Sequence, residues 1–323
     1  MTNAFADRIR QRFPEGLTGI MVIGGTRTSY VLQHNRDSEN PGLITDMRAY
    51  VMEMLGEYFK LIDWFYDLGG QNLVIPPLAY QRFMSYDRQY MAVMTKMTLL
   101  LTEGFALDYY RQHDVDPYFA GIDTLLKLPA DHPAHQLAVA LGDFQRAWEY
   151  QPGRRKLLWE IAPIPLYTFW NLKETLDPAE VAEVDAALAA TDDLEQVYQT
   201  LYRVYARAVL GTDMPVPHFY LGTNRNGDLK LRSMAPISLL NGSATRFYYT
   251  PYPTLFITYE TLQAIVEDVA FGTTMSTSKA DYDERFTSDM ANAEYERNMA
   301  LSADPRTTIG FVRSLNGAFD TED

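Results

Sequence analysis

Apolar residues recur at helical spacing between residues 45 and 68, which predicts a long amphipathic helix. The apolar positions are Met47, Val51, Met54, Leu55, Tyr58, Leu61, Ile62 and Phe65. Residues three and four apart share one face of a helix, so this face is expected to pack against a core. Similar spacing and start signals predict further helices over 3–13, 91–111, 132–150, 177–190, 192–210 and 258–271.

Short apolar runs lie between these predicted helices and are typical of buried strands. They cover 19–23, 72–75, 118–120, 156–162, 217–221 and 246–250. The pair Pro76-Pro77 is expected to end the second run, and Tyr30-Val31-Leu32 to form a further extended segment. Because strands alternate with helices, the sequence predicts an α/β protein with a single open, mainly parallel sheet flanked by helices. Without an internal repeat or a long linker, residues 1–323 are expected to form one domain, with a short N-terminal helix and an acidic C-terminal tail.

Composition narrows the possible functions. Apolar residues make up 47% of the 323 residues, which is enough for a sizeable core. The net charge of −14 disfavours nucleic-acid binding and docking on anionic lipid. The chain has no cysteine, so disulfides, thiolate metal sites and cysteine nucleophiles are excluded. No signal peptide and no transmembrane-length run is present, so we expect a cytoplasmic protein without stable membrane insertion.

The first candidate site follows the strand predicted at 19–23. Gly24 and Gly25 break this apolar run, and Thr26 and Arg27 follow at once. A strand that runs into a glycine turn exposes backbone N–H groups at the carboxyl edge of a parallel sheet. The guanidinium of Arg27 suits phosphate oxygens. The pattern therefore indicates a diphosphate site, although a simple tight turn would give the same pattern.

A second candidate lies in the stretch 220–233. A predicted strand ends at Gly222, and a polar loop carrying Arg225 and Arg232 follows it. Loops that follow different strands of a parallel sheet converge on one edge, so these arginines and Arg27 could grip one diphosphate. That arrangement requires the first and fifth strands to be neighbours, which the sequence does not show.

Aromatic residues are the candidates for an apolar pocket that would accept a cation. They include Tyr50 on the long helix and Tyr90 after the second strand, with Asp87 beside the latter as a possible proton acceptor. Nearby Tyr80, Phe83 and Tyr86 belong to the same group. Each of these rings could equally be part of a core.

Three other features have structural interpretations that compete with functional ones. Asp192 and Glu195 partly resemble an aspartate-rich metal motif, but their spacing favours a capping box at a helix start. His218 lies within an apolar strand and is expected to be a hydrogen-bonded core residue. The polar stretch 34–41 is expected to be a solvated loop, or else a lid over the glycine turn.

Together, these motifs resemble those of the cis-prenyltransferase superfamily, in particular its bacterial diterpene synthase branch, which includes the tuberculosinol and kolavelool synthases. The segment 23–27 looks like the family's strand-1 phosphate motif, Asp-Gly-(Thr/Asn)-Arg-Arg. The segment 74–77 followed by 87–90 is similar to its Ser-Pro and Asp-Arg-Tyr stretch, and 225–233 looks like its paired-arginine loop. The segments 246–250 and 259–262 resemble the closing strand and helix of the branch, so the matches keep their order from 19 to 313.

The sequence departs from the family pattern at the strand-1 motif. The family's aspartate, a Mg²⁺ ligand in chain-elongating members, is Gly24 here, and the second arginine is Thr28. Chain elongation and a standard Mg²⁺ site are therefore both in doubt. Asp37, Glu39 and Asp46 are possible replacement ligands, and nothing selects among them.

The resemblance implies an enzyme that ionises a bicyclic C20 prenyl diphosphate and lets water capture the allylic cation. It implies that Gly24, Gly25, Thr26, Arg27, Arg225 and Arg232 bind the diphosphate. The candidates for accepting the proton of that water are Tyr50, Asp87 and Tyr90, and the resemblance favours the two tyrosines. A Mg²⁺ cofactor and a homodimer are also implied. The alternatives are a cis-prenyltransferase that condenses isopentenyl diphosphate with an allylic primer, and a non-catalytic subunit that binds prenyl diphosphate.

Overall fold

A computed structural model describes residues 4–35, 44–79, 88–223, 245–250, 252–272 and 287–303. The chain divides into two compact units. The first unit comprises Met1–Ile23, Thr45–Gly222 and Leu231–Tyr248, and the second comprises Gly24–Ile44, Thr223–Lys230 and Tyr249–Asp323.

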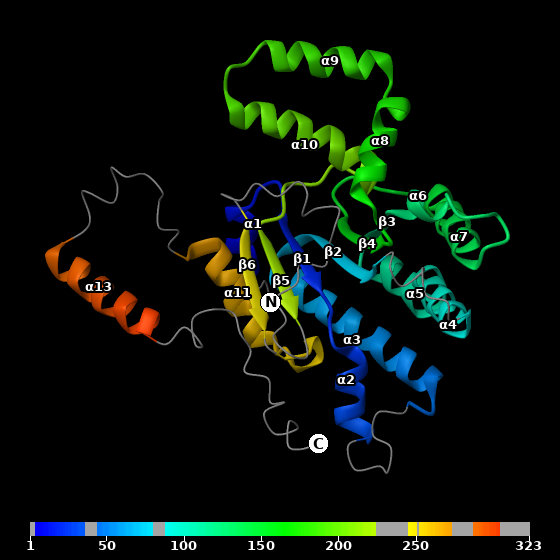
Figure 1. Ribbon diagram of the computed structural model, residues 1–323, viewed down its shortest axis with the longest axis horizontal. Helices are drawn as coiled ribbons and strands as arrows, with labels where there is room; N and C mark the ends of the chain where they lie inside the picture. Colours follow the sequence, from blue (N-terminus) through cyan, green and yellow to red (C-terminus); the bar gives the residue numbers. More distant parts are fainter. Residues whose placement is uncertain are drawn as a thin grey trace. The chain divides into compact units, whose positions relative to one another are not determined.

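Strands and helices alternate along most of the chain (Figure 1). The strands are β1 (Leu17–Val22), β2 (Gly70–Leu78), β3 (Val115–Ala120), β4 (Arg155–Ile161), β5 (Phe219–Thr223) and β6 (Arg246–Thr250). The longer helices are α1 (Ala4–Arg12), α3 (Met47–Asp67), α4 (Arg88–Leu99), α5 (Gly104–Gln112), α7 (Pro133–Ala147), α8 (Pro165–Thr175), α9 (Pro178–Ala189), α10 (Leu194–Leu210), α11 (Tyr259–Phe271) and α13 (Ser288–Ala303). Shorter helical segments are α2 (Thr26–Tyr30), η1 (Val31–Asn35), η3 (Leu100–Thr102), α6 (Ile122–Leu125) and η5 (Thr254–Phe256).

One six-stranded sheet, in the order β3-β4-β2-β1-β5-β6, organises the fold. The pairings of β1 with β2, β1 with β5, β2 with β4 and β3 with β4 are all parallel. The predicted open, mainly parallel sheet flanked by helices is therefore confirmed. β1 lies in the middle, and the chain passes from it to β2 on one side while β5 joins it on the other. Such a reversal of strand order is where ligands bind at the carboxyl edge of open α/β sheets.

Helices cover both faces of the sheet because successive strand residues point to opposite sides. Leu158 of β4 and Tyr220 of β5 belong to a buried cluster that includes Tyr202 of α10. Their chain neighbours face the other way: the ring of Trp159 lies 6.1 Å from that of Phe59 of α3. The two rings are both nearly inaccessible to solvent. In Figure 1 the sheet runs between α10 and α3.

Several predicted boundaries are wrong, and each has a local cause. β2 continues through Pro76 and Pro77, because the β2–β4 register shifts between Ile75 and Leu78 and leaves the prolines out of the regular ladder. The predicted helix 91–111 is broken into α4, η3 and α5, where Gly104 adopts a positive φ of 51°.

The segment after the glycine turn is helical rather than extended. The predicted extended run at Tyr30 instead belongs to α2, which continues into the π-helix η1. The backbone N–H of Ser29 donates to the carbonyl oxygen of Gly25 (2.9 Å), and its hydroxyl donates to the same oxygen (3.1 Å). Most of the predicted loop or lid at 34–41 lies outside the described residues.

His218 directly precedes β5 and joins it to β1; it is hydrogen-bonded as predicted, but it is half-buried rather than part of the core. The backbone N–H of Thr18 donates to Nδ1 of His218 (3.0 Å), and the N–H of His218 donates to the carbonyl oxygen of Thr18 (2.9 Å). The ring also makes an edge contact with Phe13, at 4.5 Å between centroids. Burial lowers the pKa of His218 from 6.5 to about 4.

This lowered pKa predicts that His218 destabilises the protein in mild acid. The unfolded chain keeps the ordinary histidine pKa, so it binds the proton more tightly than the folded chain does. The contribution of His218 to the free energy of unfolding is fully present above pH 6.5 and is lost as the pH falls toward about 4. We expect a loss of about 2 kcal/mol between pH 7 and pH 4.5, measured by urea unfolding. His218→Asn should lose that part of the pH dependence; an unchanged pH profile in the variant would contradict the assignment.

Candidate active site

The turn at the carboxyl end of β1, residues 24–27, is held by two threonine side chains. The backbone N–H of Gly24 donates to Oγ1 of Thr223 (2.9 Å) and to Oγ1 of Thr254 (2.8 Å). In return, the N–H of Thr254 donates to the carbonyl oxygen of Gly24 (3.1 Å). The hydroxyls of Thr223 and Thr254 also contact each other, and both residues are buried. This β1 turn is therefore fixed to the end of β5 and to η5.

No side chain can be accommodated at Gly24. A Cβ built there would lie 2.3 Å from the carbonyl oxygen of Thr223 and 3.2 Å from its carbonyl carbon. Real Cβ atoms are not found so close to another heavy atom, and the atoms in the way are backbone. An aspartate at this position would need the backbone of β1 and β5 to move apart.

The hydrogen bonds of Gly24 also narrow the predicted diphosphate site. The N–H of Gly24 already has two hydroxyl acceptors, so a diphosphate would have to bind the N–H groups of the residues that follow. Gly25 adopts the left-handed conformation with φ of 73° and immediately precedes α2. A Cβ at Gly25 would lie 2.9 Å from Cβ of Pro253. Thr26 is half-buried, and Arg27 is exposed in the first turn of α2.

The structure answers the question that the sequence left open about the two arginine segments. β1 and β5 are adjacent and parallel, with Val22 opposite Gly222. The turn that carries Arg27 and the loop that carries Arg225 and Arg232 therefore begin at the same edge of the sheet. Arg225 and Arg232 themselves lie outside the described residues.

The proposed proton-handling residues belong to other elements. Tyr50 is half-buried in the first turn of α3. Tyr90 lies in the first turn of α4, and Asp87, which precedes that helix, lies outside the described residues. Tyr50 belongs to the first unit, whereas residues 24–27 belong to the second. Tyr58, two turns further along α3, has its pKa raised by burial and by Tyr50.

No group of three or more His, Cys, Asp or Glu side chains is arranged to hold a metal ion within the described part of the chain. Of the possible replacement ligands, Asp46 is the N-cap of α3, where its carboxylate accepts from the N–H of Ala49 (2.9 Å). Asp37 and Glu39 lie outside the described residues. At Gly24 itself, the packing leaves no room for a carboxylate ligand.

The acidic motif at 192–195 is a helix cap, as predicted, but its register differs by one residue. Asp193, rather than Asp192, is the N-cap of α10, and its carboxylate accepts from the N–H of Glu195 (2.9 Å). The N–H of the cap residue Asp193 donates to the hydroxyl of Thr191 (3.1 Å), two residues earlier in the chain. The expected capping box between Asp192 and Glu195 is therefore wrong.

This register predicts different effects for the two aspartates. Asp193→Ala should lower the free energy of unfolding by about 1 kcal/mol, because it removes the acceptor for a helix N–H. Asp192→Ala, its neighbour, should change it by less than about 0.5 kcal/mol. Urea unfolding of both variants measures this difference, and equal losses would contradict the observed cap.

Two threonines important for the site, Thr223 and Thr254, were missed at the sequence level. The sequence contains only weak indications of their role. Thr223 directly follows Gly222, at the end of a predicted strand, and Thr254 follows Pro253, 230 residues after Gly24. Only the adjacency of β1 and β5 and the position of η5 bring their hydroxyls to Gly24. Their role is to position the turn rather than to perform chemistry.

No helix among the described residues is both long and apolar enough to cross a lipid bilayer.

Comparison with known proteins gives a likeness at the level of fold. No protein-family model and no curated protein sequence matches the chain. Among solved structures, it is similar to lavandulyl diphosphate synthase from Lavandula x intermedia in complex with dimethylallyl diphosphate, with a TM-score of 0.52 and 12% identity over 80% of this chain and 96% of that chain. A probable undecaprenyl diphosphate synthase from Campylobacter jejuni matches with a TM-score of 0.45 and 11% identity over 78% of this chain and 94% of that chain. The first likeness confirms the predicted cis-prenyltransferase-like fold, and at 12% identity it extends to the fold alone.

Proposed function

We propose that this chain ionises a bicyclic C20 prenyl diphosphate, such as kolavenyl or tuberculosinyl diphosphate, and lets water capture the allylic cation. The carbon–oxygen bond breaks and diphosphate leaves with the electron pair. A water oxygen then bonds to the cation and loses one proton, which gives a diterpene alcohol and diphosphate. The observation that carries the proposal is the packing around Gly24, which excludes a carboxylate where chain-elongating members of the resembled family place one.

Arg27, Arg225 and Arg232 would neutralise the charge that develops on the leaving diphosphate. Guanidinium groups present several N–H donors in a fork that matches phosphate oxygens. Charge stabilisation of this kind accelerates the reaction when it is stronger in the transition state than in the bound substrate. The adjacency of β1 and β5 supports this role, because both arginine segments begin at one sheet edge.

The cation would need a dry pocket with aromatic faces and a single positioned water. We assign Tyr50 and Tyr90 as the preferred groups for orienting that water and Asp87 as the alternative proton acceptor. No step in this scheme is routed through a metal ion.

If this assignment holds, Tyr50→Phe or Tyr90→Phe should change the product rather than diphosphate release. Each substitution removes one hydroxyl and keeps the ring, so ionisation should continue while water capture becomes less efficient. We expect the alcohol yield to fall about tenfold or more, with olefins in its place. Mass spectrometry of the products measures this. Unchanged alcohol from both variants would remove the tyrosines from the proposal.

A cis-prenyltransferase that condenses isopentenyl diphosphate with an allylic primer is the second candidate. The fold likeness to lavandulyl diphosphate synthase, solved with dimethylallyl diphosphate, favours it. The same space restriction at Gly24 argues against it.

Incubation with C15 and C20 diphosphates, bicyclic ones included, distinguishes the candidates. Each substrate is tested with and without isopentenyl diphosphate and with and without Mg²⁺, and products are identified by mass spectrometry. A C20 alcohol formed without isopentenyl diphosphate supports the proposal, and dependence of this product on Mg²⁺ would assign the cofactor. A longer chain would show condensation, and tight binding without turnover would show a non-catalytic subunit; either result overturns the proposal.

The homodimer implied by the family resemblance is part of this proposal. Analytical ultracentrifugation of the purified chain tests it, and a monomer at all concentrations would contradict it.

A further inference from the structure

A pocket of about 680 Å³ lies in the first unit, at the amino ends of β1, β2 and β4. The end of α1 and one face of α10 complete its walls. The proposed diphosphate site follows the carboxyl end of β1, so this pocket opens at the other edge of the sheet. This pocket could therefore bind a ligand that takes no part in the proposed reaction.

The lining of this amino-edge pocket is basic, although the whole chain carries a net charge of −14. Two carboxylates, Glu15 and Asp213, face five cationic side chains. The cationic side chains are Arg10, Arg154, Lys156, Arg203 and Arg207. Local cationic groups on an acidic protein indicate a site for a particular anion rather than a general polyanion surface.

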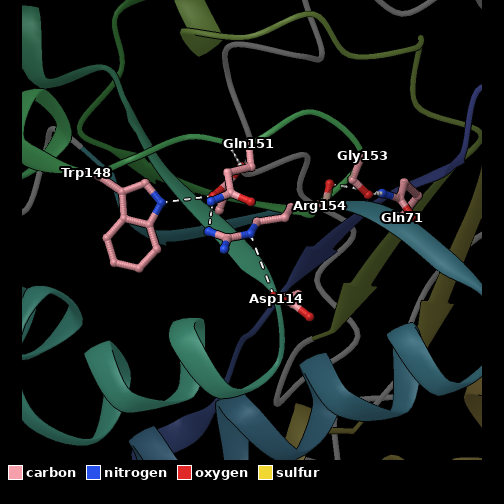
Figure 2. A network of polar contacts seen from close by, with 7 residues as sticks. Gln71, Asp114, Trp148, Gln151, Gly153 and Arg154 are labelled. Atoms are coloured by element: carbon pink, nitrogen blue, oxygen red, sulfur yellow. Dashed lines mark hydrogen bonds and ion pairs between the residues drawn. The ribbon is translucent and has the colours of Figure 1, made fainter.

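One wall of the pocket contains Arg154, which forms ion pairs with two carboxylates. Its guanidinium lies 3.7 Å from the carboxylate of Asp114 and 3.6 Å from that of Asp116. Asp116 is 1% exposed and also accepts hydrogen bonds from Nε1 of Trp148 (2.9 Å) and the N–H of Gln151 (3.0 Å). Figure 2 shows this network of polar contacts. The carboxylates hold Arg154 from outside the pocket lining.

The same wall is tied to β2 through Gln71. Its side-chain amide donates to the carbonyl oxygens of Gly153 (3.2 Å) and Arg154 (3.0 Å) (Figure 2). These bonds fix the turn before β4, and Lys156 follows that turn as the second residue of β4. A preformed wall lowers the ordering cost of binding a ligand.

Two cations of the pocket, Lys156 and Arg203, form no close ion pair with a carboxylate of the described residues, although Asp213 and Asp116 act on Lys156 electrostatically. The ammonium of Lys156 donates to the backbone carbonyl of Asp213, and burial lowers its pKa. The guanidinium of Arg203 makes no hydrogen bond or ion pair with any described residue. Its neighbour one turn later, Arg207, differs because it contacts Asp213 (2.5 Å) and Glu180 (3.8 Å). Lys156 and Arg203 are therefore the groups with unused donors.

The rest of the lining is partly apolar. Phe13, Met214 and Pro215 contribute to the wall. An inorganic anion alone would leave this surface in water, whereas a small organic group could cover it. The volume suits a compact metabolite rather than a polymer.

We propose that the amino-edge pocket binds a small phosphate monoester, with the phosphate at Lys156 and Arg203 and the organic part against Phe13, Met214 and Pro215. The phosphate gives both cations a negatively charged partner, and its oxygens accept several hydrogen bonds at once. The binding does not depend on the reaction at the β1 turn.

Isothermal titration of the full chain with glycerol 3-phosphate, adenosine 5′-monophosphate and inorganic phosphate tests this proposal. The titrations use the Arg27→Ala/Arg225→Ala chain as well as the unaltered one, so that phosphate at the proposed diphosphate site is separated from phosphate at this pocket. We expect at least one monoester to bind both chains equally and to bind more tightly than inorganic phosphate. Lys156→Gln/Arg203→Gln should weaken that binding about tenfold or more, because charge-assisted hydrogen bonds are lost.

The matched control is Lys96→Gln/Arg111→Gln, which removes the same charge from exposed positions of α4 and α5 outside the pocket lining. It should leave the affinity unchanged, and circular dichroism should show all variants folded. The proposal is overturned if no monoester binds, if inorganic phosphate binds as tightly, or if both double variants weaken binding equally. Loss of binding in the Arg27→Ala/Arg225→Ala chain would also overturn it, because the ligand would then belong to the other site.

Discussion

Replacing Gly24 with alanine is expected to lower the free energy of unfolding by about 3 kcal/mol, at the upper end of ordinary overpacking. The added Cβ would meet the carbonyl oxygen of Thr223 at 2.3 Å. A flexible side chain could turn away from such a contact, but this oxygen belongs to the backbone of β5, which is paired with β1. Separating the strands would also disturb the bonds from the N–H of Gly24 to Thr223 and Thr254.

Gly56→Ala is the matched control for this substitution. Gly56 is exposed on α3, and a Cβ there would meet no atom within 4 Å. Alanine should raise stability by about 0.5–1 kcal/mol at this position, because glycine is the poorer helix former. Urea unfolding of both variants gives opposite signs if packing decides the result. A Gly24→Ala protein as stable as the unaltered chain would refute the close approach.

Gly24→Asp tests whether the same close packing also prevents a gain of activity. The aspartate would restore the family's strand-1 residue at a place without room for it, so we expect the folded protein to accumulate poorly rather than to gain Mg²⁺-dependent condensation.

Thr254→Val keeps the test informative if both Gly24 variants fail to fold. It removes one hydroxyl acceptor of the Gly24 N–H at nearly constant volume and should cost about 1 kcal/mol.

Arg27→Ala and Arg225→Ala should each slow diphosphate release from a C20 substrate by about a hundredfold or more. That factor corresponds to about 2.7 kcal/mol of lost transition-state stabilisation. Charge builds up on diphosphate as the carbon–oxygen bond breaks, so the loss should be larger in kcat than in substrate binding. Single-turnover release of diphosphate measures it directly.

The control for these variants is Arg111→Ala, which removes an exposed arginine from α5 in the first unit. Its rate should stay within about twofold of that of the unaltered chain, and thermal unfolding should show that Arg27→Ala remains folded because its side chain is exposed. Lysine in place of either arginine should recover part of the rate, since it keeps the charge but loses the fork of donors. A normal rate in Arg225→Ala would remove the paired-arginine loop from the site.

Local chemistry made much of the fold predictable from the sequence. The period of apolar residues in α3 predicted most of its buried face, of which Val51 and Phe65 are examples, although Met47 is exposed. The helix predicted over 258–271 is α11, and it begins after Thr258, whose hydroxyl accepts from the N–H of Thr261 (3.2 Å). These features depend on residues a few positions apart. The break at Gly104 and the passage of β2 through two prolines were missed, because each depends on how neighbouring elements hold the backbone.

The sequence by itself determined the class of fold, the buried faces of the helices and the glycine turn with its arginine. Spacing and residue type are enough for these, since they act within one element. Tertiary structure alone decided that β5 pairs with β1, which places Thr223 against Gly24 and starts both arginine segments at one sheet edge. It also decided that Gly24 has no room for a side chain, because the atom in the way comes from a residue 199 positions later. The amino-edge pocket has the same origin: its cations come from separate segments, and only the packing of α1, α10 and three strands brings them around one space.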